Sequence, residues 1–174
     1  THDTAEVHFA RCRAYLELDD LVNAGQCLRR ARIAKPPQDW RVVWHEALVA
    51  LANGDVPAAE QAFETVYSTL PGELAPKLAL GYCAEHTSRP KEADRLYEAV
   101  WRRDHTQGSA AFGLARIRLS EGDRAGAVAI LDEVPRVSRH YDSAAVAAVL
   151  VLSGQLRSGA PTLADLTSAI HRLP

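Results

Sequence analysis

The chain has 174 residues, of which 47% are hydrophobic and 24% are charged, and its formal net charge is −2. This composition is that of an ordinary globular protein, and it excludes the clustered lysine and arginine by which a protein binds nucleic acid. The longest apolar run, residues 144–152, is far shorter than the roughly twenty residues that cross a bilayer. We therefore expect a cytoplasmic protein that binds neither nucleic acid nor a membrane. The lack of methionine indicates a fragment of a longer protein.

Small residues recur along the chain in the same frame, at spacings of 35, 34 and 34 residues. Each small residue of the second series is followed by a large apolar residue four positions on and by another apolar residue three positions later. This spacing is typical of an amphipathic helix, so each copy of the frame predicts two helices. The small positions are Cys12, Ala47, Gly81 and Ala115 in the first helix of each copy, and Ala24, Ala59, Ala93 and Ala127 in the second.

The predicted helices follow in chain order, separated by residues that favour turns and caps. They lie at residues 4–18, 21–34, 40–53, 57–69, 74–86, 90–103, 108–121 and 124–134, followed by an irregular pair at 142–153 and 162–172. The corresponding repeats are about 4–36, 40–71, 74–105 and 108–137, with capping helices at about 142–172. Pro161 occupies the place where the frame expects another small residue, which favours a divergent terminal pair.

Helix-turn-helix units at a period of thirty-four residues are the signature of the tetratricopeptide repeat. A single unit cannot bury its apolar faces alone, so several units must stack. The sequence therefore predicts an all-α fold, a right-handed superhelical solenoid of tetratricopeptide repeats, as a single domain over residues 1–174.

Four segments are more specific than the generic repeat. They read DWRVVWHEALVALANGD (39–55), PGELAPKLALGYCAE (71–85), AAFGLARIRLSEGDRAGAVAILDEVP (110–135) and SRHYDSA (138–144). These segments resemble the repeat region of the actinobacterial Ser/Thr protein kinase G family. The resemblance implies a C-terminal domain that follows a rubredoxin-like metal domain and a kinase domain. ATP, magnesium and a rubredoxin-type metal are thereby implied for the full-length protein, and no cofactor for this chain.

The chain itself lacks catalytic and metal-binding sequence motifs. A protein kinase requires a glycine-rich loop, a strand lysine, an H-R-D-L-x-x-x-N loop and a D-F-G segment, and none of them occurs. Cys12, Cys27 and Cys83 are too few and too far apart for a zinc site or a disulfide framework, so we expect buried free thiols. We therefore expect neither catalytic nor metal-binding residues, and direct phosphoryl transfer by this chain is the weakest hypothesis.

A stacked repeat leaves a concave surface along its first helices, and this surface is the expected site of partner binding. The partner-binding residues predicted there are Phe9, Arg13, Arg41, Trp44, Leu48, Leu78, Tyr82, Phe112 and Arg116. Some of these side chains could instead pack against neighbouring helices. The resemblance implies a noncatalytic regulatory domain that binds its own kinase domain and protein substrates and could form a homodimer. The alternative is an independent tetratricopeptide adaptor that binds an unrelated protein.

Overall fold

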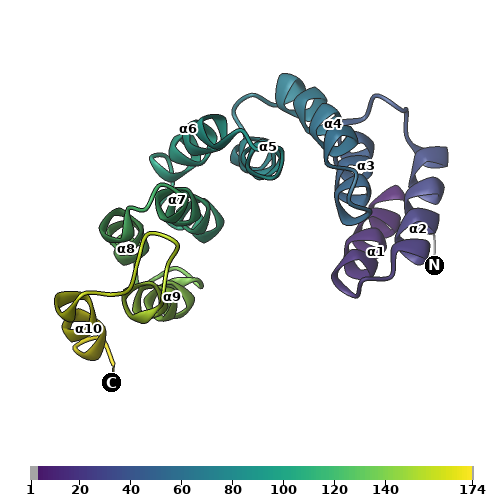
Figure 1. The fold of residues 1–174 in the computed structure, drawn as a ribbon. Helices are drawn as coiled ribbons and strands as arrows, with labels where there is room; N and C mark the ends of the chain where they lie inside the picture. Colours follow the sequence, from purple (N-terminus) through teal and green to yellow (C-terminus); the bar gives the residue numbers. More distant parts are fainter. Residues whose placement is uncertain (1–3, 174) are drawn as a thin grey trace. The chain divides into compact units, whose positions relative to one another are not determined.

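A computed structural model describes residues 4–173, and the regular structure of this part of the chain is helical apart from an isolated bridge between Leu156 and Gly159 (Figure 1). The helices are α1 (Ala5–Glu17), α2 (Leu21–Ala34), α3 (Trp40–Ala52), α4 (Val56–Thr69), α5 (Leu74–His86), α6 (Pro90–Trp101), α7 (Gly108–Ser120), α8 (Arg124–Asp132), α9 (Tyr141–Ser153) and α10 (Leu163–Ile170). Their bounds agree with the predicted ones to within two residues, which confirms the helix-turn-helix pattern.

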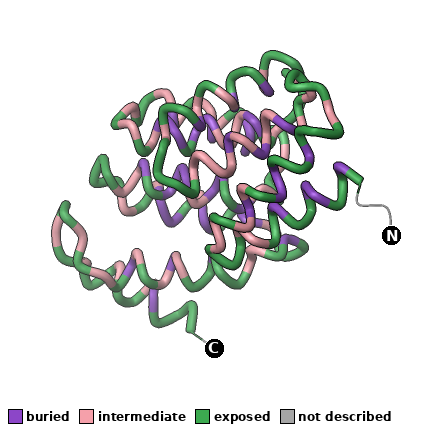
Figure 2. The backbone as a smooth tube through the Cα atoms, turned by 90° about the vertical axis from the view of Figure 1, so that its right-hand side faces the viewer, coloured by how far each residue is buried: buried purple, intermediate pink, exposed green. Residues whose placement is uncertain are grey.

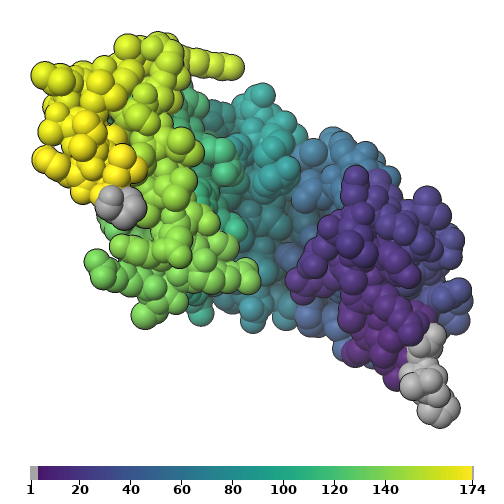
Figure 3. Space-filling model, turned by 90° about the horizontal axis from the view of Figure 1, so that it is seen from below, coloured from purple at the N-terminus to yellow at the C-terminus, as the bar shows by residue number. Residues whose placement is uncertain are grey.

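The chain divides into two units, the first ending at Thr87 and the second beginning at Ser88, and each is described by itself. In the first unit α1 pairs with α2, α3 pairs with α4, and α5 packs on α4. In the second unit α7 packs on both α6 and α8, and α9 packs on α8 and α10. Figure 3 shows α9 and α10 side by side in green-yellow and yellow.

Figure 2 shows the buried residues in purple, as short stretches that alternate with exposed ones along the helices. All the predicted small positions are buried, with Ala24, Ala59, Ala93 and Ala127 wholly inaccessible. The large apolar residues that follow them are buried as well; these are Leu28, Phe63, Tyr97 and Leu131, and then Ala31, Val66, Val100 and Val134. The three cysteines are buried and outside any disulfide, as predicted. Small residues therefore let paired helices approach, and large residues fill the space around the contact.

The turn between the two helices of each repeat has the same conformation in all four copies. A residue with positive φ stands at the equivalent place each time, namely Asp19 (57°), Gly54 (79°), Ser88 (60°) and Gly122 (84°). Such a residue ends a helix in the left-handed conformation that glycine adopts most easily. The next residue caps the following helix in three copies, where the side chains of Asp20, Asp55 and Asp123 accept a hydrogen bond from a backbone N–H. In the third copy Pro90 begins the helix, and its fixed φ suits that position.

Helices α6 and α7 of the second unit approach each other closely at a glycine. A Cβ atom at Gly113 would lie 2.5 Å from Cε2 of the buried Tyr97 ring and 2.7 Å from its Cδ2 and Cζ. Glycine at this position therefore allows the phenol ring of α6 to lie directly on the backbone of α7.

We expect Gly113→Ala to lower the free energy of unfolding by about 1–3 kcal/mol, because overpacking the Tyr97 contact outweighs the better helix propensity of alanine. Gly25 of α2 is the matched control, since a Cβ there would meet only Nη1 of Arg29 at 3.6 Å. We expect Gly25→Ala to raise the free energy of unfolding by about 0.5–1 kcal/mol. Denaturant titration measures both, and equal effects of the two substitutions would contradict the packing argument.

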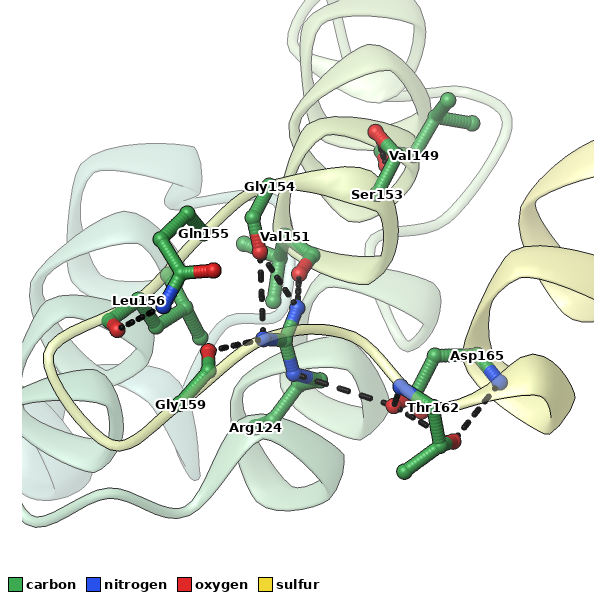
Figure 4. Close-up of polar contacts among 10 residues, drawn as sticks. All are labelled: Arg124, Val149, Val151, Ser153, Gly154, Gln155, Leu156, Gly159, Thr162 and Asp165. Atoms are coloured by element: carbon green, nitrogen blue, oxygen red, sulfur yellow. Dashed lines mark hydrogen bonds and ion pairs between the residues drawn. The ribbon is translucent and has the colours of Figure 1, made fainter.

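Arg124 connects α8 to the irregular C-terminal pair (Figure 4). Arg124, at the start of α8, donates through Nη1 to the carbonyl oxygens of Val151 and Gly154, the latter at 3.1 Å. Its Nη2 donates to Gly154 at 3.1 Å and to Gly159 at 3.2 Å. Its Nε lies 3.9 Å from Oδ2 of Asp165, in the first turn of α10. The last carbonyl groups of a helix have no donor within it, so the guanidinium completes the end of α9 while it holds the following loop and α10.

We expect Arg124→Ala to lower the free energy of unfolding by about 2 kcal/mol, because three carbonyl groups lose a charged donor whose side chain is only 11% exposed. Amide hydrogen exchange should accelerate from residue 155 to residue 170. Arg157 lies exposed on the same loop, and Arg157→Ala is the control expected to change neither measurement. Unchanged exchange in the Arg124 variant would show that α10 is held without Arg124, by its apolar contacts and by the ion pair of Arg172 with Asp132 of α8.

Candidate partner-binding site

The first unit has a pocket of about 350 Å³ between α1 and α3. Helix α1 contributes Glu6, Phe9, Ala10 and Arg13, and helix α3 contributes Trp40, Arg41, Trp44 and His45. On α1 these residues stand at positions i, i+3, i+4 and i+7, and on α3 they stand at i, i+1, i+4 and i+5, so each set lies on one face of its helix. The pocket brings together four of the predicted partner-binding residues, namely Phe9, Arg13, Arg41 and Trp44.

The aromatic residues form the apolar walls of the pocket. Phe9 stacks on the ring of His45 with 4.5 Å between the ring centroids. Trp44 meets the buried Phe63 edge to face at 5.1 Å, which ties its indole to the core. Trp40 is 41% exposed and has the guanidinium of Arg41 over its ring at 5.9 Å. One tryptophan is thus anchored, and the other is open to a partner.

Most of the charges around the pocket are paired. Arg41 binds Asp39 with both ends of its guanidinium, Nε to Oδ1 at 2.8 Å and Nη2 to Oδ2 at 2.5 Å. These bonds lower the pKa of Asp39 to about 2. Arg41 also donates to Glu6 at 2.7 Å, and Nζ of Lys35 lies 3.4 Å from the same carboxylate.

Arg13 differs from these residues. Its side chain is exposed and lines the pocket, and it forms no salt bridge with any residue in the described range 4–173. The two positive charges of Arg41 and Lys35 are balanced by the two negative charges of Asp39 and Glu6. The positive charge of Arg13 is therefore left unbalanced at the pocket.

His45 is buried in the wall of the pocket and is 7% exposed. Its Nδ1 lies 2.7 Å from the carbonyl oxygen of Arg41, which can only accept, so this nitrogen carries a proton and donates. Its Nε2 is buried and has no hydrogen-bond partner among the residues that the structure describes. Burial lowers the pKa of His45, and the positive charge of Arg13 lowers it further. The imidazole is therefore neutral at physiological pH.

We expect His45 to make the domain less stable in acid. Its pKa is lower in the folded state than the ordinary 6.5, so the unfolded chain binds the proton more tightly and stability falls as the pH drops from about 7.5 through 6.5. His45→Phe keeps a ring against Phe9 and should flatten the dependence of the unfolding free energy on pH. His171, exposed at the end of α10, supplies the control, because His171→Phe should leave the slope intact. An unchanged slope for the His45 variant would contradict burial of the neutral ring.

The other predicted partner-binding residues lie outside this pocket. In the first unit Leu48 and Leu78 are half-buried, and the exposed Tyr82 stacks on His86 at 3.9 Å. In the second unit Phe112 is half-buried and Arg116 is exposed, both on α7.

The sequence reasoning missed several residues of these surfaces. Glu6, Trp40 and His45 of the pocket were not predicted, although Trp40 lies one turn before Trp44. In the second unit Val146 and Leu150 of α9 are 59% and 64% exposed. They stand thirty-four residues after Phe112 and Arg116, so continuing the repeat frame into α9 would have found them.

The described part of the chain offers neither a metal site nor a membrane-spanning helix. No group of three or more histidine, cysteine, aspartate or glutamate residues between residues 4 and 173 could hold a metal ion. Over the same range, no helix combines the length and the apolar character needed to cross a membrane.

Comparison with known proteins gives a family for the chain. A family model described as the protein kinase G tetratricopeptide repeat matches residues 1–174. Serine/threonine-protein kinase PknG of Mycobacterium leprae is 44% identical over 154 residues, which cover 88% of this chain and 20% of that protein. PknG of Mycolicibacterium smegmatis is 40% identical over 158 residues, which cover 90% of this chain and 20% of that protein. The chain thus spans about a fifth of the length of these relatives.

Solved structures with low sequence identity share the fold. MamA protein superposes with a TM-score of 0.67 at 11% identity, over 98% of this chain and 88% of that one. PilF of Pseudomonas aeruginosa gives a TM-score of 0.70 at 15% identity, over 97% of this chain and 73% of that one. YrrB, described as a TPR protein with an unusual peptide-binding site, gives a TM-score of 0.63 at 15% identity, over 96% of this chain and 85% of that one. These likenesses establish the tetratricopeptide fold and nothing about ligands.

Proposed function

Because this chain belongs to the protein kinase G tetratricopeptide repeat family, a family of non-catalytic interaction domains, we propose that it regulates a Ser/Thr protein kinase of which it is a part. The observation that carries the proposal is the match to kinase PknG over about nine-tenths of this chain but only a fifth of the relatives. The remaining length of such a protein would supply the kinase domain with ATP and magnesium, and the rubredoxin-type metal. We place the whole enzyme in the cytoplasm.

The domain would act by holding proteins in position. Its partner-binding residues include tryptophan, tyrosine and arginine, which are the residue types that carry most of the energy of protein interfaces. We propose that the pocket between α1 and α3 contacts either the kinase domain of the same protein or a protein substrate. Formation of a homodimer through this chain is a further part of the proposal. The domain would thereby raise the local concentration of the substrate near the kinase domain.

The alternative is an independent adaptor that binds an unrelated protein. Both hypotheses use the same surface, and they differ in whether the kinase domain is a partner. A direct binding measurement with a separately produced kinase domain therefore discriminates between them.

We expect the chain to bind that kinase domain, and Trp40→Ala to weaken the binding about thirtyfold, since truncating an interface tryptophan often costs about 2 kcal/mol. Trp40 is 41% exposed and does not belong to the buried core, so this variant should keep its stability in a denaturant titration. Ile33→Ala is the control, because Ile33 is 88% exposed on α2 and outside the pocket. Calorimetry measures the affinity. Absence of binding by the unsubstituted chain would favour the adaptor.

A further inference from the structure

We propose that the pocket between α1 and α3 recognises an extended peptide segment in which an acidic residue stands two positions from an aromatic or large aliphatic residue. The inference deepens the proposed interaction function and rests on it for the existence of a protein partner. It adds the chemical class of the segment that is bound. Three features of the first unit support it, namely charge, shape and spacing.

The charge of the pocket selects a carboxylate. Arg41 is already occupied by Asp39 and Glu6, and Lys35 lies beside the same Glu6 carboxylate. Arg13 is left with no ion-pair partner among residues 4–173, and its guanidinium is exposed at the pocket. An arginine can bind a carboxylate through two parallel hydrogen bonds, so an acidic side chain fits this position better than a neutral or basic one.

The walls beside Arg13 suit an apolar side chain. Phe9 and the neutral ring of His45 are stacked, and the indoles of Trp40 and Trp44 complete the lining. The volume of about 350 Å³ is near the lower end of ligand pockets, which is room for one or two side chains of a partner. Aromatic walls without unpaired charge would reject a second charged group at this place because its desolvation would be uncompensated.

The distance between the two parts sets how far apart the two residues stand in the partner. Arg13 stands four residues after Phe9 on α1, which is about one helical turn, or roughly 6 Å along the axis. Side chains two positions apart on an extended peptide lie on the same face and about 6.6 Å apart, so the acidic residue and the apolar residue must stand two positions apart, in either order. Nucleic acid fits the same positive charge poorly, since phosphate binding depends on many cations rather than one.

The test selects peptides from a random dodecapeptide phage library on the intact chain. The best binder is then synthesised, together with a version in which its acidic residues are replaced by their amides. Calorimetry compares the two peptides on the unsubstituted chain, on Arg13→Glu and on Arg30→Glu. Arg30 is the matched control, because it lies exposed on α2 of the same unit and does not line the pocket.

We expect the selected peptides to carry aspartate or glutamate two positions from an aromatic or large aliphatic residue. Removing the acidic charge from the peptide and reversing the charge of Arg13 should each weaken binding about tenfold or more, and the two losses should not add. Arg30→Glu should change the affinity less than about twofold.

Three results would overturn the inference: recovery of no peptide, selected peptides with no acidic residue, or equal losses for the Arg13 and Arg30 variants. None of these results depends on the kinase domain. Peptide binding that needs Arg13, together with no affinity for a kinase domain, would leave this inference standing and refute the proposed regulatory role.

Discussion

The close approach of paired helices at small residues is the constraint on which the rest of the structure depends. Cys12, Ala24, Ala47 and Ala59 are wholly inaccessible in the first unit, and Gly113 receives the ring of Tyr97 in the second. Where a helix pair meets at such a residue, the larger side chains one turn away interdigitate and fill the core. Substituting a larger residue at the contact would separate the helices along their length, because close-packed interiors have no free volume to absorb the change.

This constraint also determines which surface remains for binding. Helix α3 uses Val42 and Ala47 for the core, while Trp40 and Arg41 lie outside it and line the pocket. Trp44 belongs to both, since it lines the pocket and touches the buried Phe63. A substitution of Trp44 would therefore alter stability and binding together, whereas Trp40 can report on binding alone. The anchoring of one indole in the core keeps the shape of the pocket before any partner arrives, which reduces the entropy lost on binding.

The periodic part of the structure was predictable from the sequence, and the parts that depend on single side chains were not. Helix bounds and buried stripes follow from a repeat that the four copies share, so each copy supports the others. The Arg124 contacts join residues that are far apart in sequence and occur once, and a residue-type pattern gives no signal for them. In the pocket, the repeat frame located Phe9 and Trp44, but the neutral state of His45 and the pairing of Arg41 with Glu6 depend on burial and on side-chain rotamers. The positive φ of Asp19 could not be predicted from the sequence either, because glycine stands at the equivalent position in only two of the four copies.

The charge of Arg13 links binding at the pocket to the protonation of His45. Burial holds the pKa of His45 down, and the charge of Arg13 holds it down further, while the carbonyl group of Arg41 accepts from the ring. A carboxylate bound to Arg13 would cancel part of that charge and so raise the pKa of His45. Linkage is reciprocal, so protonation of His45 would in turn favour the bound carboxylate by the same free energy. This rise in the pKa cannot exceed the lowering that Arg13 causes, and burial is the larger cause of the low pKa. A partner that covers the pocket would increase the burial of His45. Partner binding would therefore change the pKa of His45 in two opposite ways: exclusion of water lowers it, and neutralisation of Arg13 raises it. The extent to which the partner excludes water decides which of the two changes is larger.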